Sequence, residues 1–175
     1  RGESLLAMDQ DNALIFENGE PGGPVDSWFA RLGQRVADIL NEVGVAYCSG
    51  GVMASNAAWR KDVGDWRKTI GGWIRRNRPE SILSADIFFD TMPVYGAGDL
   101  GRTLIDDARQ AAAGSKSFLQ ALSLNAADFR TPLGAFGRFR LTDGRIDLKK
   151  GGIMPIFATA RVLAIRHGIA ARSTA

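Results

Sequence analysis

The feature that most constrains this chain is a pair of aspartates, Asp9 and Asp11, just ahead of the short apolar run 13–16. In an extended strand successive side chains alternate faces, so the two carboxylates are predicted to project from one side, close together. Like charges this close repel, and a hard divalent cation with oxygen ligands would relieve the repulsion. The pair therefore indicates either a metal site or a solvated turn before a strand.

Composition is that of an ordinary globular protein. The 175 residues are 45% apolar and 23% charged, enough for one substantial core or for a small α/β domain with a helical appendage. The net charge of +3 is small, and scattered acids such as Asp62 and Asp106 leave no continuous basic face, so nucleic acid is not an expected partner. The cluster Arg75, Arg76 and Arg78 is read either as a solvated helix end or as a contact for an acidic partner.

The single cysteine, Cys48, excludes an internal disulfide and a cysteine-rich zinc site, and it fits a reducing cytoplasm, where we expect the protein. Because the only histidine, His167, is far off in sequence, Cys48 is interpreted as a small packed side chain rather than a nucleophile. No apolar run reaches the roughly 18 residues that span a bilayer, so no membrane partner is predicted.

Helical spacing of apolar residues predicts helices over 25–43, 62–76, 100–113, 116–125 and 154–166. Short strands are predicted at 13–16, 45–48, 84–90, 136–141 and 145–148. The buried face of the first helix is predicted to consist of Trp28, Phe29, Leu32, Val36, Ile39 and Leu40. A second stripe, Trp59, Trp66, Ile70 and Trp73, is interpreted as core packing in preference to a base-stacking platform.

Several stretches, in order along nearly the whole chain, resemble a family of nucleotidyltransferases often fused to cyclic-nucleotide-binding and CBS domains. That family is related to the uridylyltransferases that modify the PII nitrogen-signalling protein. The matching stretches are Arg-Gly-Glu at Arg1 with Asp-Gln-Asp-Asn-Ala-Leu-Ile at Asp9, Gly-Gly-Val-Met-Ala-Ser-Asn at Gly50, Ile-Phe-Phe-Asp-Thr-Met-Pro-Val-Tyr-Gly at Ile87, and Asp-Leu-Lys-Lys-Gly-Gly at Asp147.

The resemblance implies an α/β (α+β) fold, with a nucleotidyltransferase-like mixed sheet and a helical C-terminal subdomain. Residues 1–98 would form the catalytic core and residues 99–175 the helical subdomain. A flavodoxin-like fold is the alternative, but the chain lacks a Gly-rich phosphate loop after its first strand.

The resemblance also implies a Gly-Ser turn shortly before Arg1, where its backbone N–H groups would hold nucleotide phosphates. The chain begins at Arg1 and that turn is absent from it. We expect a longer natural protein of which this is a fragment; the alternative is that the turn has been lost.

Nucleotidyl transfer builds up negative charge that two metal ions about 4 Å apart can neutralise, and such sites usually need three acids. Asp86 and Asp90 are the candidates for the third, and strand alternation places both on one face without choosing between them. The resemblance implies Asp90, so Asp9, Asp11 and Asp90 are the predicted catalytic and metal ligands, for Mg²⁺ or Mn²⁺. A cap on the following turn is the other interpretation of Asp90.

For the nucleotide, the resemblance brings Arg1 close to the triphosphate. Ser55 and Asn56, after a Gly-Gly loop, would bind sugar or base, or would cap the helix that follows. Lys149 and Lys150 resemble a Lys- and Gly-rich segment beyond the catalytic domain of PII uridylyltransferases; they would bind an anion, or form an ordinary basic turn before a helix.

Two functions follow from these observations. The first is Mg²⁺-dependent transfer of a nucleoside monophosphate from a nucleoside triphosphate to an acceptor hydroxyl, on a protein in the uridylyltransferase-like case. The second is a catalytically degenerate, nucleotide-binding regulatory module that signals to fused cyclic-nucleotide-binding or CBS domains. Three carboxylates favour the enzyme, since binding alone can rely on fewer.

Overall fold

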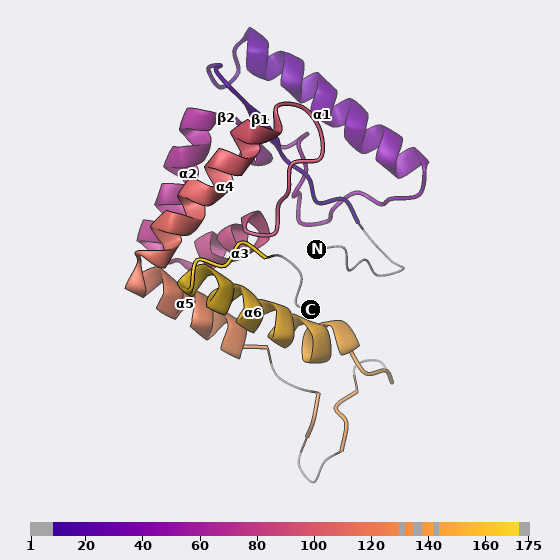
Figure 1. Cartoon of the computed structure of the whole chain (residues 1–175). Coiled ribbons are helices and arrows are strands. Elements are labelled where there is room, and N and C mark those ends of the chain that lie inside the picture. The colour runs from indigo at the N-terminus through magenta and orange to yellow at the C-terminus, as the bar shows by residue number, and fades with distance from the viewer. Residues whose placement is uncertain (1–8, 130–131, 135–137, 142–143, 172–175) are drawn as a thin grey trace. The chain divides into compact units, whose positions relative to one another are not determined.

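A computed structural model describes residues 9–129, 132–134, 138–141 and 144–171. The chain forms two compact units (Figure 1). Unit 1 comprises the chain up to Ile70 together with Thr91–Asp106, and unit 2 comprises Gly71–Asp90 and the chain from Asp107 on. Helices predominate and the described sheet has two parallel strands, so the α/β class is confirmed in its coarse form while the predicted mixed sheet is smaller than expected.

The sheet of unit 1 joins β1 (Leu14–Phe16) to β2 (Arg60–Asp62), with Leu14 opposite Arg60 and Phe16 opposite Asp62. The short 3₁₀ helix η1 (Ala57–Trp59) immediately precedes β2. Ahead of β1 the chain is extended as well, and Asp9 forms an isolated parallel bridge with Ala46.

The strand predicted over 45–48 is therefore reduced to that single bridge. Gln10 donates its backbone N–H to Ala46 at 2.9 Å, but Asn12 donates to Val52 at 3.0 Å. Because the chain turns between Ala46 and Val52, no continuous ladder can form there, which explains why a full strand is absent.

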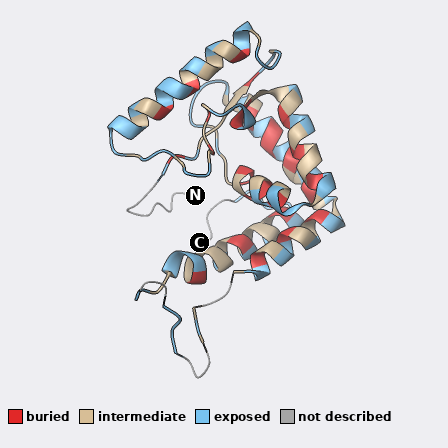
Figure 2. Cartoon of the chain, turned by 180° about the vertical axis from the view of Figure 1, so that it is seen from behind, coloured by how far each residue is buried: buried red, intermediate tan, exposed pale blue. Residues whose placement is uncertain are grey.

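Helix α1 (Pro24–Glu42) contacts β2, and its buried residues differ from the predicted ones. They are Asp26, Gly33 and Ala37. Of the predicted face, Trp28, Val36 and Ile39 are exposed, whereas Phe29, Leu32 and Leu40 are half-buried. Figure 2 accordingly shows mostly pale blue and tan along this helix. The prediction was wrong for the exposed half of that face, because small residues, which hydrophobicity overlooks, allow the closest approach of backbones.

Gly33 is the point of closest approach. A Cβ at this position would lie 2.6 Å from the backbone C and O atoms of Ala54 and 2.9 Å from the N atom of Ser55. Since backbone atoms cannot swing aside as a flexible side chain can, only glycine fits here. Helix α1 is thereby held against the loop before β2.

Aromatic side chains contribute a large part of the remaining unit 1 core. Trp66, in α2 (Val63–Arg76), is fully buried and donates its Nε1–H to the backbone carbonyl of Leu14 at 3.0 Å. Trp59 is also buried, 6.0 Å from Trp66 between ring centroids, and Phe16 stacks on Phe29 at 4.6 Å. The core-packing interpretation of Trp59 and Trp66 is confirmed.

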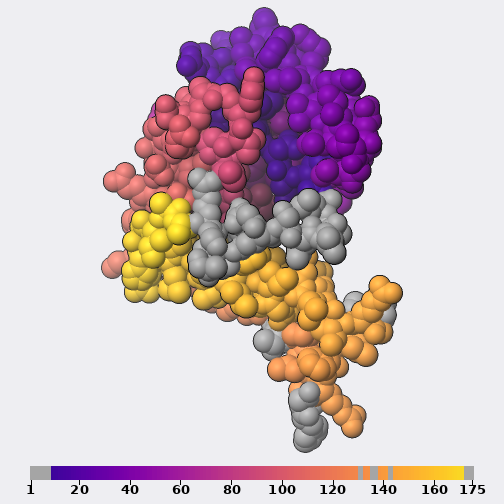
Figure 3. All heavy atoms as spheres, turned by 45° about the vertical axis from the view of Figure 1, so that its right-hand side comes forward, coloured from indigo at the N-terminus to yellow at the C-terminus, as the bar shows by residue number. Residues whose placement is uncertain are grey.

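Unit 2 is helical. It contains α3 (Pro79–Phe88), α5 (Lys116–Ala127) and α6 (Met154–Arg166), and α5 packs against both α3 and α6. Its fully buried side chains include Phe88, Phe118 and Leu122. Described residues between α5 and α6 project from these helices as the orange protrusion in Figure 3.

All five predicted helices are confirmed to within two residues at each end. The last has the predicted bounds, α4 runs from Gly98 to Ala113, and α2 and α5 differ only at their ends.

The strand predicted over 84–90 was wrong, because the structure has the helix α3 there. Its start carries Pro79 in the first turn and an acid, Glu80, next to it, which favour a helix N-terminus. Burial of Ile82, Ala85 and Phe89 then follows the helical period rather than the alternation of a strand.

Two further strand predictions fall in the segment before α6. Residues 135–137 of the predicted strand 136–141 lie outside the described residues, and Phe139 forms an isolated antiparallel bridge with Leu133. The strand predicted over 145–148 is reduced to a bridge residue at Arg145, since Leu148 is already helical and leads into the π-helix η3 (Lys149–Ile153). Across the described residues, no helix is both long and apolar enough to cross a bilayer.

The contact at Gly33 yields a stability prediction. Gly33→Ala should lower the free energy of unfolding by about 2 kcal/mol, because the new methyl group meets backbone atoms. Gly72→Ala is the matched control: it lies in α2 with nothing within 4 Å of the added Cβ, and it should raise stability by about 0.5–1 kcal/mol. Urea unfolding of both variants measures this, and an unchanged or raised stability for Gly33→Ala would contradict the packing.

Candidate metal centre

Asp9 and Asp11 lie on the solvent side of the extended segment before β1, and both side chains are exposed. Gln10 between them points the other way and is 2% exposed. Its Nε2 group donates to the backbone carbonyls of Ala37 at 2.9 Å and Val45 at 3.0 Å. By tying α1 to this segment, Gln10 fixes which side the two carboxylates face.

The two carboxylates are brought together with a third potential ligand, the thiol of Cys48. One ligand atom from each of Asp9, Asp11 and Cys48 lies within 4.8 Å of the others. Two exposed carboxylates this close suit a divalent cation, which would screen their repulsion and bind through carboxylate oxygens. The donors present therefore fit the metal ion expected from the sequence.

Cys48 is half-buried, in the turn that begins the loop to β2. Burial raises the pKa of its thiol, and a hydrogen bond to Asp11 raises that pKa further. Hydrogen bonds from the backbone N–H groups of Val52 and Gly50 oppose the shift, since they stabilise the thiolate. The thiol thus interacts directly with one of the candidate ligands, which the sequence did not indicate.

The loop that carries Cys48 is fixed by Asn12, the residue after the aspartate pair. Asn12 donates its backbone N–H to Val52 at 3.0 Å, and its Oδ1 atom accepts from the N–H of Ala54 at 2.8 Å. A side chain on the segment before β1 therefore holds both sides of the candidate centre in one geometry.

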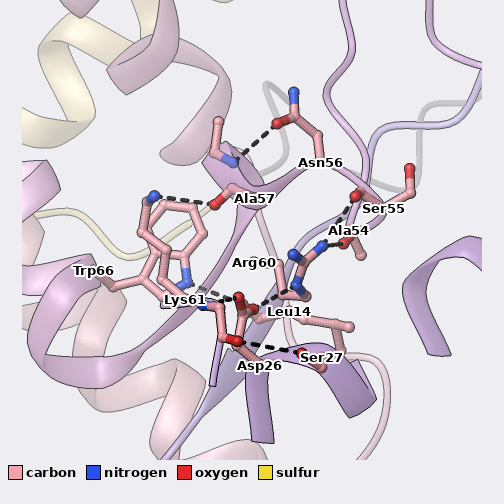
Figure 4. A network of polar contacts seen from close by, with 12 residues as sticks. Leu14, Asp26, Ser27, Ala54, Ser55, Asn56, Ala57, Arg60, Lys61 and Trp66 are labelled. Atoms are coloured by element: carbon pink, nitrogen blue, oxygen red, sulfur yellow. Dashed lines mark hydrogen bonds and ion pairs between the residues drawn. The ribbon is translucent and has the colours of Figure 1, made fainter. Parts of the chain in front are cut away.

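The buried ion pair between Arg60 and Asp26 also holds the loop before β2 (Figure 4). Arg60, at the start of β2, donates from Nε to Asp26 of α1 at 2.8 Å, and the two side chains are 6% and 12% exposed. The Nη1 group of Arg60 donates to the backbone carbonyls of Ala54 at 3.0 Å and Ser55 at 2.9 Å. One guanidinium thus joins the sheet, α1 and the loop.

The same contacts shift the titration of Asp26. The hydrogen bond from Arg60, followed by that from the N–H of Gly22, lowers the pKa of this carboxyl below its usual value. The N–H of Gly22 lies 2.8 Å from its Oδ2 atom. Asp26 therefore stays ionised, and stabilises the fold, over the whole neutral range.

The predicted nucleotide-binding residues of this region have structural partners. Asn56 caps η1, accepting from the N–H of Ala58 at 3.0 Å, and it donates to the carbonyl of Gly51 at 3.1 Å. Ser55 is half-buried and its carbonyl is engaged by Arg60. Arg1 lies outside the described residues. The nucleotide-binding role of these three residues stays a prediction.

Asp90, the predicted third ligand, belongs to unit 2 and lies in the turn after α3. Arg161 of α6 forms ion pairs with both Asp86 and Asp90. Both carboxylates reach the same guanidinium, Asp86 from the last turn of α3 and Asp90 from the turn after it, and not through strand alternation. The side chain of Asp90 is 37% exposed, against 9% for Asp86, so Asp86 is the deeper partner of the guanidinium.

Lys149 and Lys150 open the π-helix η3 and are exposed. Asp147 caps this turn, with its Oδ1 atom 2.9 Å from the N–H of Lys150. Gly151 is buried, and a Cβ there would lie 2.5 Å from Pro132. One N–H that could face an anion is therefore already occupied, and the anion-binding role stays a prediction.

The sequence analysis did not identify several of these residues. Alternation could have placed Gln10 on the inward side once Asp9 and Asp11 faced outward. Arg161 is the one charge between Met154 and Ile165, which is a signal for a buried ion pair. Nothing in the sequence pairs Cys48 with Asp11 or Arg60 with Asp26, because those contacts depend on how distant segments pack.

The chain thus combines an N-terminal region bearing an exposed carboxylate pair with a separate helical C-terminal region. Residues 1–80 match the family described as "Putative nucleotidyltransferase DUF294", and residues 116–175 match the "Putative nucleotidyltransferase substrate binding domain". The chain belongs to this nucleotidyltransferase family. No curated protein and no solved structure matches it significantly. The predicted domain boundary after residue 98 falls between the two matched regions and stays a prediction.

The ion pair beneath the loop gives a pH prediction. Asp26→Asn leaves the Arg60 charge without its counter-ion and should lower the free energy of unfolding at pH 7 by about 2–3 kcal/mol. Because the folded pKa of Asp26 is lowered, its contribution is complete above the unfolded value and is lost as the pH falls through the folded value. The difference between the parent protein and the variant should therefore shrink below about pH 4.

Denaturant unfolding from pH 7 to pH 3 measures this, with Glu42→Gln as the control for an exposed acid of the same helix. If the difference in the free energy of unfolding between the parent protein and Asp26→Asn did not change with pH, the account would be contradicted.

Proposed function

We propose that this chain is the catalytic part of a Mg²⁺-dependent nucleotidyltransferase. It would transfer a nucleoside monophosphate from a nucleoside triphosphate to an acceptor hydroxyl, on a protein in the manner of the PII uridylyltransferases. The observation that carries the proposal is the exposed Asp9–Asp11 pair, whose ligand atoms lie within 4.8 Å inside the region matched to the nucleotidyltransferase family.

The roles of the residues follow from their chemistry. Asp9 and Asp11 would hold the metal ion through their carboxylate oxygens, with Mn²⁺ able to replace Mg²⁺. When bound, that ion supplies positive charge to the phosphates of the nucleotide and to the leaving pyrophosphate. Gln10 and Asn12 position the pair, since each ties the segment to a different neighbour, α1 or the loop after Cys48.

The rest of the site is assigned on the resemblance. Asp90 would be the third carboxylate, Arg1, Lys149 and Lys150 would meet the phosphates, and Ser55 with Asn56 would meet the sugar or base. The match of residues 116–175 to a substrate-binding domain supports a second role for the C-terminal region, which is to hold the substrate. Partner domains of the cyclic-nucleotide-binding or CBS type belong to the same proposal.

One observation favours the second function, a regulatory module that binds nucleotide without turnover. Asp90 is engaged by Arg161, and a carboxylate paired with a guanidinium is a weaker metal ligand, because the cation must displace the arginine. Under this alternative Asp9 and Asp11 would still bind metal and nucleotide, but no nucleotidyl transfer would occur.

Pyrophosphate release separates the two functions. The complete gene product, with Mg²⁺ or Mn²⁺, a candidate acceptor such as PII and each of the four ribonucleoside triphosphates in turn, should release pyrophosphate with at least one nucleotide. Asp11→Asn should reduce this more than about 100-fold, because loss of even an indirect metal partner costs 10–100-fold. Its melting temperature should be unchanged or slightly raised, since one of two repelling charges is removed.

Glu42→Gln is the control, because it neutralises an exposed acid at the end of α1 outside the candidate centre. Equal loss of activity in both variants would assign the effect to overall charge. Absence of pyrophosphate release with every nucleotide and acceptor would rule out the enzyme in favour of the binding module.

A further inference from the structure

We propose that Cys48 is a third ligand of the metal centre and that it makes this centre select thiophilic divalent cations, such as Zn²⁺ and Cd²⁺, over Mg²⁺. The inference rests on the proposed function, because it requires a metal ion at Asp9 and Asp11. It goes beyond that function by adding a sulfur ligand and a class of inhibitory cations.

The three ligand atoms lie close enough together to bind one ion. Two ligands of one ion can be no farther apart than the sum of their bonds to it, which is about 4.4 Å for one Zn–O and one Zn–S bond. The ligand atoms of Asp9, Asp11 and Cys48 lie within 4.8 Å of one another without a metal ion. Since Asp9 and Asp11 are exposed, small side-chain rotations suffice to close the remaining gap.

The sulfur is placed to meet an ion held by the aspartates. Its Sγ atom lies within 4.8 Å of a carboxylate oxygen of Asp9 and of one of Asp11. Because the thiolate and not the thiol binds metal, a cation that enters between Sγ and Asp11 displaces the thiol proton, which passes to solvent as the metal–sulfur bond forms.

The choice of cation follows from ligand softness. Mg²⁺ is a hard ion that prefers oxygen ligands and keeps several of its waters, so it would bind the aspartates and leave the thiol protonated. Zn²⁺ and Cd²⁺ accept thiolate together with carboxylate ligands and would bind all three residues. Such an ion would compete with Mg²⁺ for the site and would dissociate from it more slowly than Mg²⁺ does.

The test compares Cd²⁺ and Mn²⁺ binding by the 175-residue chain, its Cys48→Ser variant and its Asp11→Asn variant. Because Cys48 is the only cysteine of the chain, a thiolate-to-Cd²⁺ charge-transfer absorption in the ultraviolet can come from no other residue. The expected result is this absorption in the parent chain, Cd²⁺ affinity at least about tenfold lower in Cys48→Ser, and equal Mn²⁺ affinity in both. Circular dichroism melting of Cys48→Ser confirms that the variant is folded.

Asp11→Asn should weaken both Mn²⁺ and Cd²⁺ binding, because Asp11 serves both ions. Equal Cd²⁺ affinity in the parent chain and in Cys48→Ser, with Mn²⁺ still bound, would overturn the inference while leaving the proposed function in place. Full Cd²⁺ affinity in Asp11→Asn would also overturn it, since the thiol would then act apart from the aspartates. Absence of Mn²⁺ binding by the parent chain would instead overturn the proposed function, and the inference with it.

Discussion

The candidate centre depends on the buried ion pair between Asp26 and Arg60. Arg60 reaches from β2 to α1 through Asp26 and to the loop through the carbonyls of Ala54 and Ser55. A buried guanidinium without these acceptors would be costly, so the three segments can pack only when all of the contacts are made together. Gly33 permits this packing because it leaves room for the loop backbone, and Asn12 then fixes the loop beside the aspartate pair.

The sequence predicted well those features that depend on local periodicity. The bounds of α6 were correct because its apolar run ends at His167 and Gly168, and the shared side of Asp9 and Asp11 followed from the alternation of an extended chain. The resemblance identified the family correctly, as the matches of residues 1–80 and 116–175 confirm.

Two of the failures arise because the apolar density of a segment does not show how its side chains pack in the fold. The run Ile87, Phe88 and Phe89 was interpreted as a strand, yet helix α3 buries Phe88 and Phe89 among aromatic rings of unit 2. Likewise, the apolar stripe of α1 was expected to be buried, but half of it is exposed and the fully buried positions of the helix are others. The contact between Cys48 and Asp11 could not be predicted, because it depends on a turn between residues far apart in sequence.

The central claim, that Asp9 and Asp11 form a divalent cation site, is tested most directly by Mn²⁺ titration of the ¹⁵N-labelled chain monitored by NMR. Mn²⁺ broadens the signals of nuclei near it. The account predicts that low Mn²⁺ concentrations broaden the amide signals of residues 9–12 and 48–52 first, that Mg²⁺ reverses the effect, and that Asp11→Asn removes it. Broadening that begins at other acids, or that persists unchanged in Asp11→Asn, would contradict the account.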